Sequence, residues 1–441
     1  MFCINKNEEL TTELLQKMIS RFRVNVQPKL EKYKNYYDGI QNILIKEYAD
    51  KSKPCNKTVI NYCKNIVDSY CGYLATPGYI AYNGEGIEEI VDILKYNDYQ
   101  TEDNNFLLDA LIYGVAAELM YIDNNAQTRF RLINPMNCFG VFDDSLTNDL
   151  LYFVRMYKAS EWDETDTYYV DVYSDTNINH YSMSGMNGYL HFISEEPHYF
   201  NQCPANIFML PDERSIFDCI MSNQDSINTL ISAEIDDYQA FCDAYLTITG
   251  ADMDKEDVAI MKENRVLVLP EGATAAWLTK SANDAQIENI LKRMQDAIYK
   301  IAACPDFSSE TFIGGVSSGI AIQYRLTGME TRAGKIEAEM KKALQRRIEI
   351  ICGIASLTLG EEVFKDINIS FKRNIPEDVN STINMINTLK GSVSDATLLS
   401  QIPFINDVEA ELEALQEQKA ANMELYGFGA PVVEDEEEDE A

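Results

Sequence analysis

Two long stretches of helical periodicity, separated by a short insert, constrain this chain more than any other feature of its sequence. The first begins at Asp218 and carries an apolar stripe over roughly 25 residues, formed by Ile227, Leu230, Ile231, Ile235, Tyr238, Phe241, Cys242 and Tyr245. The second can be capped by Asn283 and Asp284 and places on one face Ile287, Ile290, Leu291, Met294, Ile298 and Ile301. Because the insert is short, we expect two antiparallel helices, the first about 37 Å long at 1.5 Å per residue.

The insert and the segment after the second helix have their own patterns. Within the insert we expect a short polar helix over Asp252–Asn264 and a strand over Arg265–Leu269. After Pro305 comes a loop of small residues, which leads into a helix over Ser317–Leu326. A longer helix then reaches Leu357, with a kink expected at Gly328 because glycine weakens a helix interior.

The rest of the chain alternates between helical and strand patterns. Apolar residues at helical spacing predict helices over 13–22, 29–37, 57–74 and 103–120, and near the end over 376–389 and 406–425. Between 127 and 210, short alternating or aromatic runs separated by polar turns predict an antiparallel meander, with strands at 129–133, 150–157, 168–173, 179–184 and 189–193. One more strand is expected over 366–373. The fold class is therefore α+β and mainly helical.

The charge balance excludes several classes of protein. Of 441 residues, 37 are Lys or Arg and 71 are Asp or Glu, a formal charge of −34 that disfavours tight binding to nucleic acid or to an anionic membrane. The ten cysteines are scattered without a CxxC pair, so neither a disulfide framework nor a zinc site is expected. No apolar run approaches the roughly 18 residues of a membrane span, and no signal peptide is visible. We expect an intracellular, reduced protein.

Two motifs allow an enzymatic alternative. The run Gly314–Gly319 invites a phosphate-loop interpretation, but it lacks the Gly-Lys-Ser/Thr ending and follows a helix rather than a strand. His191, Glu195 and His198 could be drawn as a metal triad, although they lack the fixed register of a helical metal motif. A nucleotide- or metal-dependent enzyme using Gly314–Gly319 or His191 and His198 is therefore the rival hypothesis.

The segment 325–347 is basic in an otherwise acidic chain. It carries three acidic and seven basic residues. The basic residues are Arg325, Arg332, Lys335, Lys341, Lys342, Arg346 and Arg347. One interpretation is a surface helix with internal salt bridges, since Glu337 and Lys341 are four residues apart. The other is a contact with the acidic face of a neighbouring subunit. At the other extreme, Glu434–Glu440 is a run of seven acids, typical of a disordered solubilising tail.

Five stretches, in this order and spacing, carry a resemblance that covers almost the whole chain. They are Tyr36–Gly39, Asn61–Leu74, Asp109–Gly114, Ser309–Ala321 and Phe404–Glu413. The sequence resembles the portal proteins of long-tailed, double-stranded DNA bacteriophages. The turn after Leu74 departs from the Gly-Xaa-Pro that relatives often have, since this chain reads Ala75-Thr76-Pro77-Gly78.

The resemblance implies a structural protein with no catalytic activity and no cofactor. Copies of the chain would form a ring, dodecameric in the virion, at one vertex of the capsid, after assembly in the host cytoplasm. Double-stranded DNA would pass through its channel during packaging and ejection, without sequence-specific binding. The other implied partners are the terminase large subunit, head-completion or connector proteins, and capsid and scaffolding proteins; no membrane is involved.

The resemblance also implies a division of the chain. Residues 1–215 and 329–375 would form the wing, 216–246 and 281–304 the two stem helices, 247–280 the clip, 305–328 the tunnel loop and helix, 376–425 the crown, and 426–441 the acidic tail. The channel would be lined by Thr311, Gly314, Gly315, Ser317, Ser318, Gly319 and Gln323. The motor or connector would dock on the clip at Asp252, Lys255, Glu256, Glu263 and Arg265.

Overall fold

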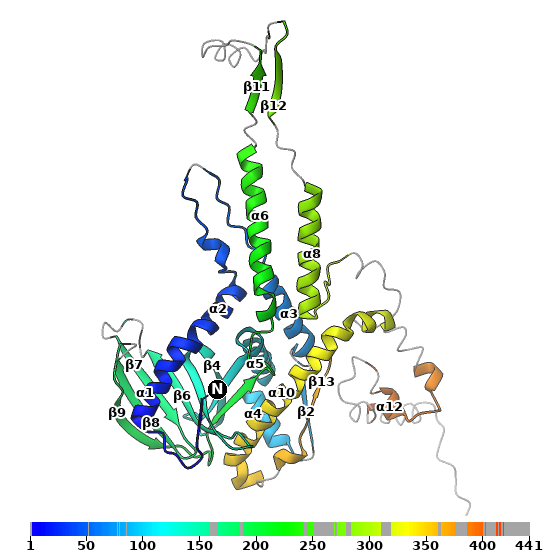
Figure 1. The fold of residues 1–441 in the computed structure, drawn as a ribbon. Coiled ribbons are helices and arrows are strands. Elements are labelled where there is room, and N and C mark those ends of the chain that lie inside the picture. The colour runs from blue at the N-terminus through cyan, green and yellow to red at the C-terminus, as the bar shows by residue number, and fades with distance from the viewer. Residues whose placement is uncertain are drawn as a thin grey trace, which may run out of the picture. The chain divides into compact units, whose positions relative to one another are not determined.

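A computed structural model of the chain shows a mixed arrangement of helices and sheets (Figure 1). It describes residues 2–241 except 52, 77, 79, 85, 159, 161, 163–165, 186 and 187; then 245–250, 269, 271–278, 284–309, 319–359, 363–374 and 386–399, with single positions 402, 412, 414, 415 and 418. The chain divides into two compact units, 1–307 with 326–374 and 308–325 with 375–441. The α+β class expected from the sequence is confirmed.

The N-terminal helices include those expected from the sequence periodicity, with different boundaries, and two that were not expected, η2 Asn42–Ile45 and α4 Glu88–Tyr96. In order, the helices are α1 Thr12–Arg21, the π-helix η1 Phe22–Val26, α2 Gln27–Asp38, the short η2, α3 Tyr62–Leu74, α4 and α5 Tyr99–Tyr113. The helix α2 ends at Gly39, whose φ of 85° suits glycine at a helix end. The helix expected from residue 57 begins only at Tyr62, and the residues before it are extended.

The helix expected over 103–120 is wrong in its second half. The helix α5 stops at Gly114, which has a φ of 82°, and the chain continues as strand β3 Val115–Ile122. A side chain at Gly114 would meet the backbone of Arg214 at 2.6 Å, so this tight crossing requires glycine. Strand pairing on both sides of β3 outweighs the helical preference of its Ala and Leu residues.

Most of the expected meander lies in a six-stranded sheet with the order β1-β5-β6-β7-β8-β9, but the strand expected over 129–133 belongs to a separate three-stranded sheet. The strands of the six-stranded sheet are β1 Phe2–Ile4, β5 Cys138–Asp143, β6 Leu150–Lys158, β7 Thr167–Tyr173, β8 Asn177–Ser184 and β9 His191–Pro197. Neighbours from β5 to β9 are antiparallel, as predicted, whereas β1 joins β5 in parallel. Strand β9 is a fully exposed edge with a register shift opposite His180 and a proline at its end.

A three-stranded sheet supplies the other wall of the β core. It has the order β10-β3-β4, with β10 at Ala205–Met209 and β4 at Thr128–Ile133. Buried side chains from both sheets pack into one cluster, formed by Ala117, Leu119, Cys138, Phe153, Tyr173, Cys203 and Ala205. A separate pair joins β2 Ile80–Asn83 to β13 Asn368–Phe371, within the strand expected over 366–373.

The two long helices are present as α6 Met221–Phe241 and α8 Asp284–Ala302, and they pack side by side (Figure 1). The apolar stripe was expected to continue to Tyr245, but that residue begins strand β11 Tyr245–Thr249, which pairs with β12 Thr274–Leu278. The helix and strand expected over 252–269 lie, apart from Leu269, outside the described residues.

Two helices expected after the second long helix are a single one. Helix α10 runs from Gly319 to Leu359 without interruption at Gly328. The C-terminal helices expected over 376–389 and 406–425 fall largely outside the described residues. Between them the chain forms the short helix α12 Asp395–Leu399.

A buried ion cluster joins α10 to the rest of the first unit. The guanidinium of Arg347 is fully buried and donates to Glu118 at 2.8, 2.9 and 3.1 Å and also to Asp103. The rings of Phe106 and Phe130 lie against it, with Phe130 at 4.4 Å. Burial alone would lower the pKa of Arg347, but the two carboxylates raise it well above the ordinary arginine value. Arg347 therefore cannot contact a neighbouring subunit, and its assignment to that group is wrong.

Replacing Arg347 with methionine should lower the free energy of unfolding by about 3–5 kcal/mol, because Asp103 and Glu118 would stay buried without their counter-charge. Urea denaturation followed by circular dichroism measures this loss. The control is Arg346→Met on the same helix, where a half-exposed pair with Glu349 at 2.8 Å predicts a loss below about 1 kcal/mol. Equal losses in the two variants would contradict a structural role for the cluster.

Candidate functional site: the polar seat of the two long helices

The most deeply buried face of α6 is polar, not apolar. Gln224, Asn228 and Ser232 are 0% exposed and Asp236 is 7% exposed. These residues recur every four positions and so lie along one side of the helix. Of the predicted apolar stripe, Ile227 is buried, whereas Leu230, Ile231 and Ile235 are only half-buried and Tyr238 is 74% exposed. The apolar face that the sequence periodicity predicts is therefore not the most deeply buried face of α6.

The polar face of α6 binds an extended segment, residues 56–62, which we call the strap. Every second backbone N–H of the strap donates to one side chain of the helix. The bonds run from Asn56 N to Asp236 Oδ1 (2.6 Å), Thr58 N to Ser232 Oγ (3.0 Å), Ile60 N to Asn228 Oδ1 (3.0 Å) and Tyr62 N to Gln224 Oε1 (3.0 Å). Four helical residues advance about 6 Å and two extended residues about 6.6 Å, so the two repeats stay in step.

Asp236 binds the N-terminal end of the strap, at Asn56. Its carboxylate also accepts from the Asn56 side chain (2.8 Å), Lys46 Nζ (2.9 Å) and Tyr48 Oη (3.2 Å). Burial alone would raise the pKa of Asp236, but the hydrogen bonds from Asn56, Lys46 and Tyr48 outweigh it and lower the pKa to about 2. The carboxylate is therefore ionised at neutral pH and fixes three separate groups.

Two tyrosines of α2 hold the base of α6. Tyr33 Oη donates to Asp218 at 2.7 Å, and Tyr36 Oη donates to Asp225 at 2.8 Å. Burial, and then the hydrogen bond to the carboxylate, raises the pKa of each phenol, so both remain protonated donors. Gln41, 2% exposed, joins this network through the side chain of Asn228.

Arg332 and Tyr70 hold the C-terminal end of α8. Tyr70 Oη donates to the carbonyls of Ala302 (3.0 Å) and Ala303 (3.1 Å), and Arg332 donates to Ala302 O (3.0 Å) and to Ile216 O (2.9 Å), just before α6. A cation at the last carbonyls of a helix is favourable because those groups carry partial negative charge. These contacts, together with the strap and the α2 tyrosines, form what we call the polar seat.

Apolar periodicity does not predict the polar seat, because the buried side chains of α6 bind backbone N–H groups and not apolar side chains. A search for apolar periodicity cannot find a face that binds N–H groups. The signal that could have revealed it is the repeat of short hydrogen-bond acceptors, Gln, Asn, Ser and Asp, at four-residue spacing on α6.

The predicted channel and docking residues are only partly described. The clip residues Asp252, Lys255, Glu256, Glu263 and Arg265 lie outside the described residues, as do Thr311, Gly314, Gly315, Ser317 and Ser318. Gly319 is the first residue of α10, and Gln323 lies on that helix with an exposed side chain. Both assignments stay predictions.

The basic segment does not act as one surface. Arg347 is in the core and is not available as proposed from the sequence, whereas Arg332 is half-buried and donates to backbone carbonyls in the polar seat. Lys342 pairs with Glu339 at 2.8 Å while remaining 72% exposed, and Lys341 lies 3.5 Å from the Asn368 side chain. The exposed members are Arg325, Lys335 and Lys342, with Lys341 and Arg346 half-buried.

The two histidines of the metal hypothesis lie too far apart. His191 begins β9 and His198 follows its last residue, a separation of about 20 Å in an extended strand. His198 Nε2 donates to Ser174 O at 3.1 Å, and burial lowers its pKa. That hypothesis is therefore wrong. Within the described part of the chain, no group of three or more His, Cys, Asp or Glu residues could hold a metal ion.

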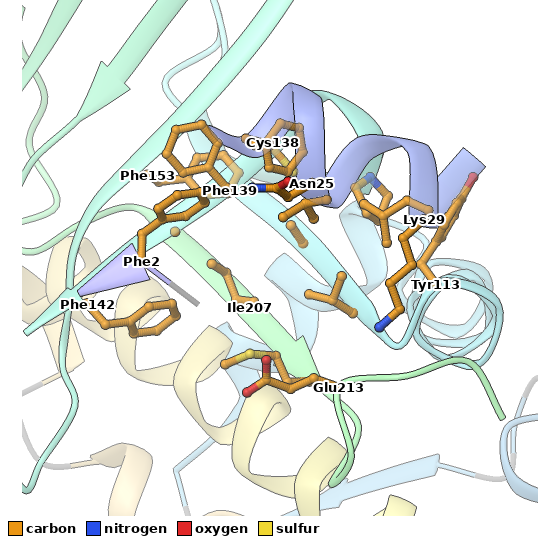
Figure 2. Close-up of a pocket in the computed structure, with 18 residues that line it drawn as sticks. Phe2, Asn25, Lys29, Tyr113, Cys138, Phe139, Phe142, Phe153, Ile207 and Glu213 are labelled. Carbon is orange, nitrogen blue, oxygen red and sulfur yellow. The ribbon is translucent and has the colours of Figure 1, made fainter. Parts of the chain in front are cut away.

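An apolar cavity of about 330 Å³ lies between η1, α2 and the strands beneath them (Figure 2). Aromatic rings line much of it, including Phe2, Phe139 and Phe153. Burial raises the pKa of the Cys138 thiol in its wall, so this sulfur stays protonated and unreactive. All of the residues that line the cavity belong to the first unit.

The contribution of Asp236 to stability should depend on pH. Because its folded pKa is below the ordinary value of about 3.9, this contribution is complete above that value and is lost as the pH falls through about 2. The difference in unfolding free energy between the native chain and Asp236→Asn should therefore shrink between pH 4 and pH 2. The control Asp92→Asn removes a carboxylate that is 77% exposed and should show a smaller change. A constant difference for Asp236→Asn would contradict the assigned contacts.

Sequence comparisons place this fold among known proteins. Residues 25–425 match the family described as phage portal protein, SPP1 Gp6-like. The portal protein of Bacillus phage SPP1 is 22% identical over 455 aligned residues, which cover 95% of this chain and 88% of that protein. The portal protein of Clostridium phage phiCD119 (strain Clostridium difficile/United States/Govind/2006) is 20% identical over 422 residues, covering 88% of this chain and 92% of that protein.

The matched region includes the β sheets apart from β1, the polar seat, both long helices and α10. None of the described helices is long and apolar enough to cross a bilayer. The family match covers far more than half of the chain, in agreement with the resemblance carried by the five sequence stretches. The chain therefore belongs to the SPP1-type family of bacteriophage portal proteins.

Proposed function

We propose that this chain is the structural subunit of a ring at one capsid vertex, through which double-stranded DNA is packaged and ejected. The observation that carries the proposal is the family match over residues 25–425. The same ring would be the docking platform for the terminase large subunit and later for head-completion or connector proteins. No catalytic step is assigned to the chain.

The charge of the chain supports a conducting rather than a gripping role. Each phosphate contact adds salt-dependent affinity, and several contacts together would hold DNA in place. A chain with a formal charge of −34 offers a mean field that repels phosphate. The small residues of the proposed tunnel loop, Gly314–Gly319, add no cationic side chain to the channel.

The polar seat supports the proposed division into wing and stem. In that division α6 and α8 belong to the stem, and α2, α3 and most of α10 belong to the wing. The contacts of Tyr33, Tyr36 and the strap with α6, and of Tyr70 and Arg332 with α8, would then join the two parts within one subunit.

Ring formation is tested by electron microscopy of negatively stained protein together with native mass. We expect rings for the unmodified chain, and a clear loss of rings for Lys335→Glu, Lys341→Glu and Lys342→Glu combined, because these cations are proposed to face an acidic neighbouring subunit. The control triple change, Lys6→Glu, Lys51→Glu and Lys53→Glu, alters the net charge equally at exposed positions and should leave rings intact. Equal effects of the two triple changes would contradict a local contact.

Docking of the motor is tested by capture of purified terminase large subunit on assembled rings. Alanine at Asp252, Lys255, Glu256, Glu263 and Arg265 together should reduce capture at least tenfold while ring images stay unchanged. Undiminished capture would place the docking surface elsewhere. Stoichiometric binding of ATP by the purified chain would instead support the nucleotide alternative at Gly314–Gly319.

A further inference from the structure

The strap is attached to α6 through its backbone rather than through its side chains. All seven strap residues are described, and each is half-buried or exposed; Lys57 and Ile60 are exposed. On the helix side of the joint, the side chains of Gln224, Asn228 and Ser232 are fully buried beneath the strap. The joint is therefore closed to water but polar on both of its surfaces.

When the joint between the strap and α6 opens, it exposes hydrogen-bonding groups, whereas the opening of an apolar contact exposes apolar surface. Separating two apolar surfaces loses the hydrophobic contribution of their whole area. Separating the strap from α6 exchanges protein hydrogen bonds for hydrogen bonds to water; the net difference is small for each bond between neutral groups and larger for the bonds to the Asp236 carboxylate. Opening this joint therefore exposes little apolar surface, and the rest of the fold need not unfold.

The two ends of the strap are not held equally. At the lower end, Tyr62 begins α3 and packs edge-on against Tyr299 of α8, with ring centres 5.9 Å apart. There the buried side chains of Gln224, Asn228 and Gln41 are bonded to one another. At the other end, the Asp236 carboxylate accepts from the backbone and side chain of Asn56, and also from Lys46, 17% exposed, and Tyr48, 39% exposed.

We infer that residues 56–60 of the strap can detach from α6 while α3 and the base of α6 remain folded. Detachment removes the lateral support of α6 between Asn228 and Asp236 and leaves the contacts of its base in place. The upper part of α6 can then shift relative to α2 and α3 and return to the same hydrogen bonds. This device rests on contacts within one chain and does not require a ring.

Hydrogen exchange of the purified full chain at increasing, sub-denaturing urea concentrations tests the inference. If the strap opens locally, the amides of Asn56, Thr58 and Ile60 exchange through an opening that depends little on urea, because little surface is exposed. The buried residues of α3 in this stretch, Ile66, Val67, Tyr70 and Cys71, should show the steep urea dependence of larger unfolding. The same dependence for strap and α3 would overturn the inference.

A matched pair of serine variants adds a second measurement. Ser232→Ala removes the acceptor of the Thr58 amide and should accelerate its exchange about fivefold to tenfold. Ser226→Ala makes the same chemical change on α6, where the hydroxyl donates only to Ser222 O at 2.9 Å, and should leave the Thr58 amide unchanged. No acceleration in Ser232→Ala, or equal acceleration in both variants, would overturn the inference. If Ser232→Ala fails to fold, the urea series on the unmodified chain decides the question.

Discussion

One arginine determines how the first unit of this protein is put together. Arg347 brings α10 against α5 and β3, whose carboxylates come from positions 103 and 118, more than two hundred residues earlier in the chain. Removing three charges from water is costly, and the planar guanidinium compensates only when both carboxylates meet its donors. Few arrangements satisfy that geometry, so the cluster fixes the register of α10 as well as its position.

The polar seat solves a related problem with neutral groups. A helix that projects from a core needs lateral support, and a purely apolar seat would hold it through one extended hydrophobic contact. Here most of the support comes from single hydrogen bonds, each of which can be exchanged for water. The charged cluster and the seat thus represent two kinds of buried polarity, one that fixes a position and one that permits a reversible opening.

The sequence predicted much of this fold and little of the seat. Periodicity located α1, α2, α6 and α8, and the alternation of residues located most of the meander. It failed for β5, which is buried along its whole length and shows no alternation, and for β3, where tertiary pairing overrides helix-forming residues. Periodicity also could not predict that Arg347 is buried while Arg346 is only half-buried, because burial depends on partners far away in the chain. The family resemblance came from motif order, which periodicity does not contain.

The exposed edge strand β9 has a consequence for any assembly of these subunits. A ring holds copies of one chain at very high local concentration, where open sheet edges could join and continue one sheet into the next. The irregular register opposite His180, the acidic residues Glu195 and Glu196, and Pro197 all disfavour such pairing. Lateral growth of the sheet is thereby discouraged in the closed ring and among subunits awaiting assembly.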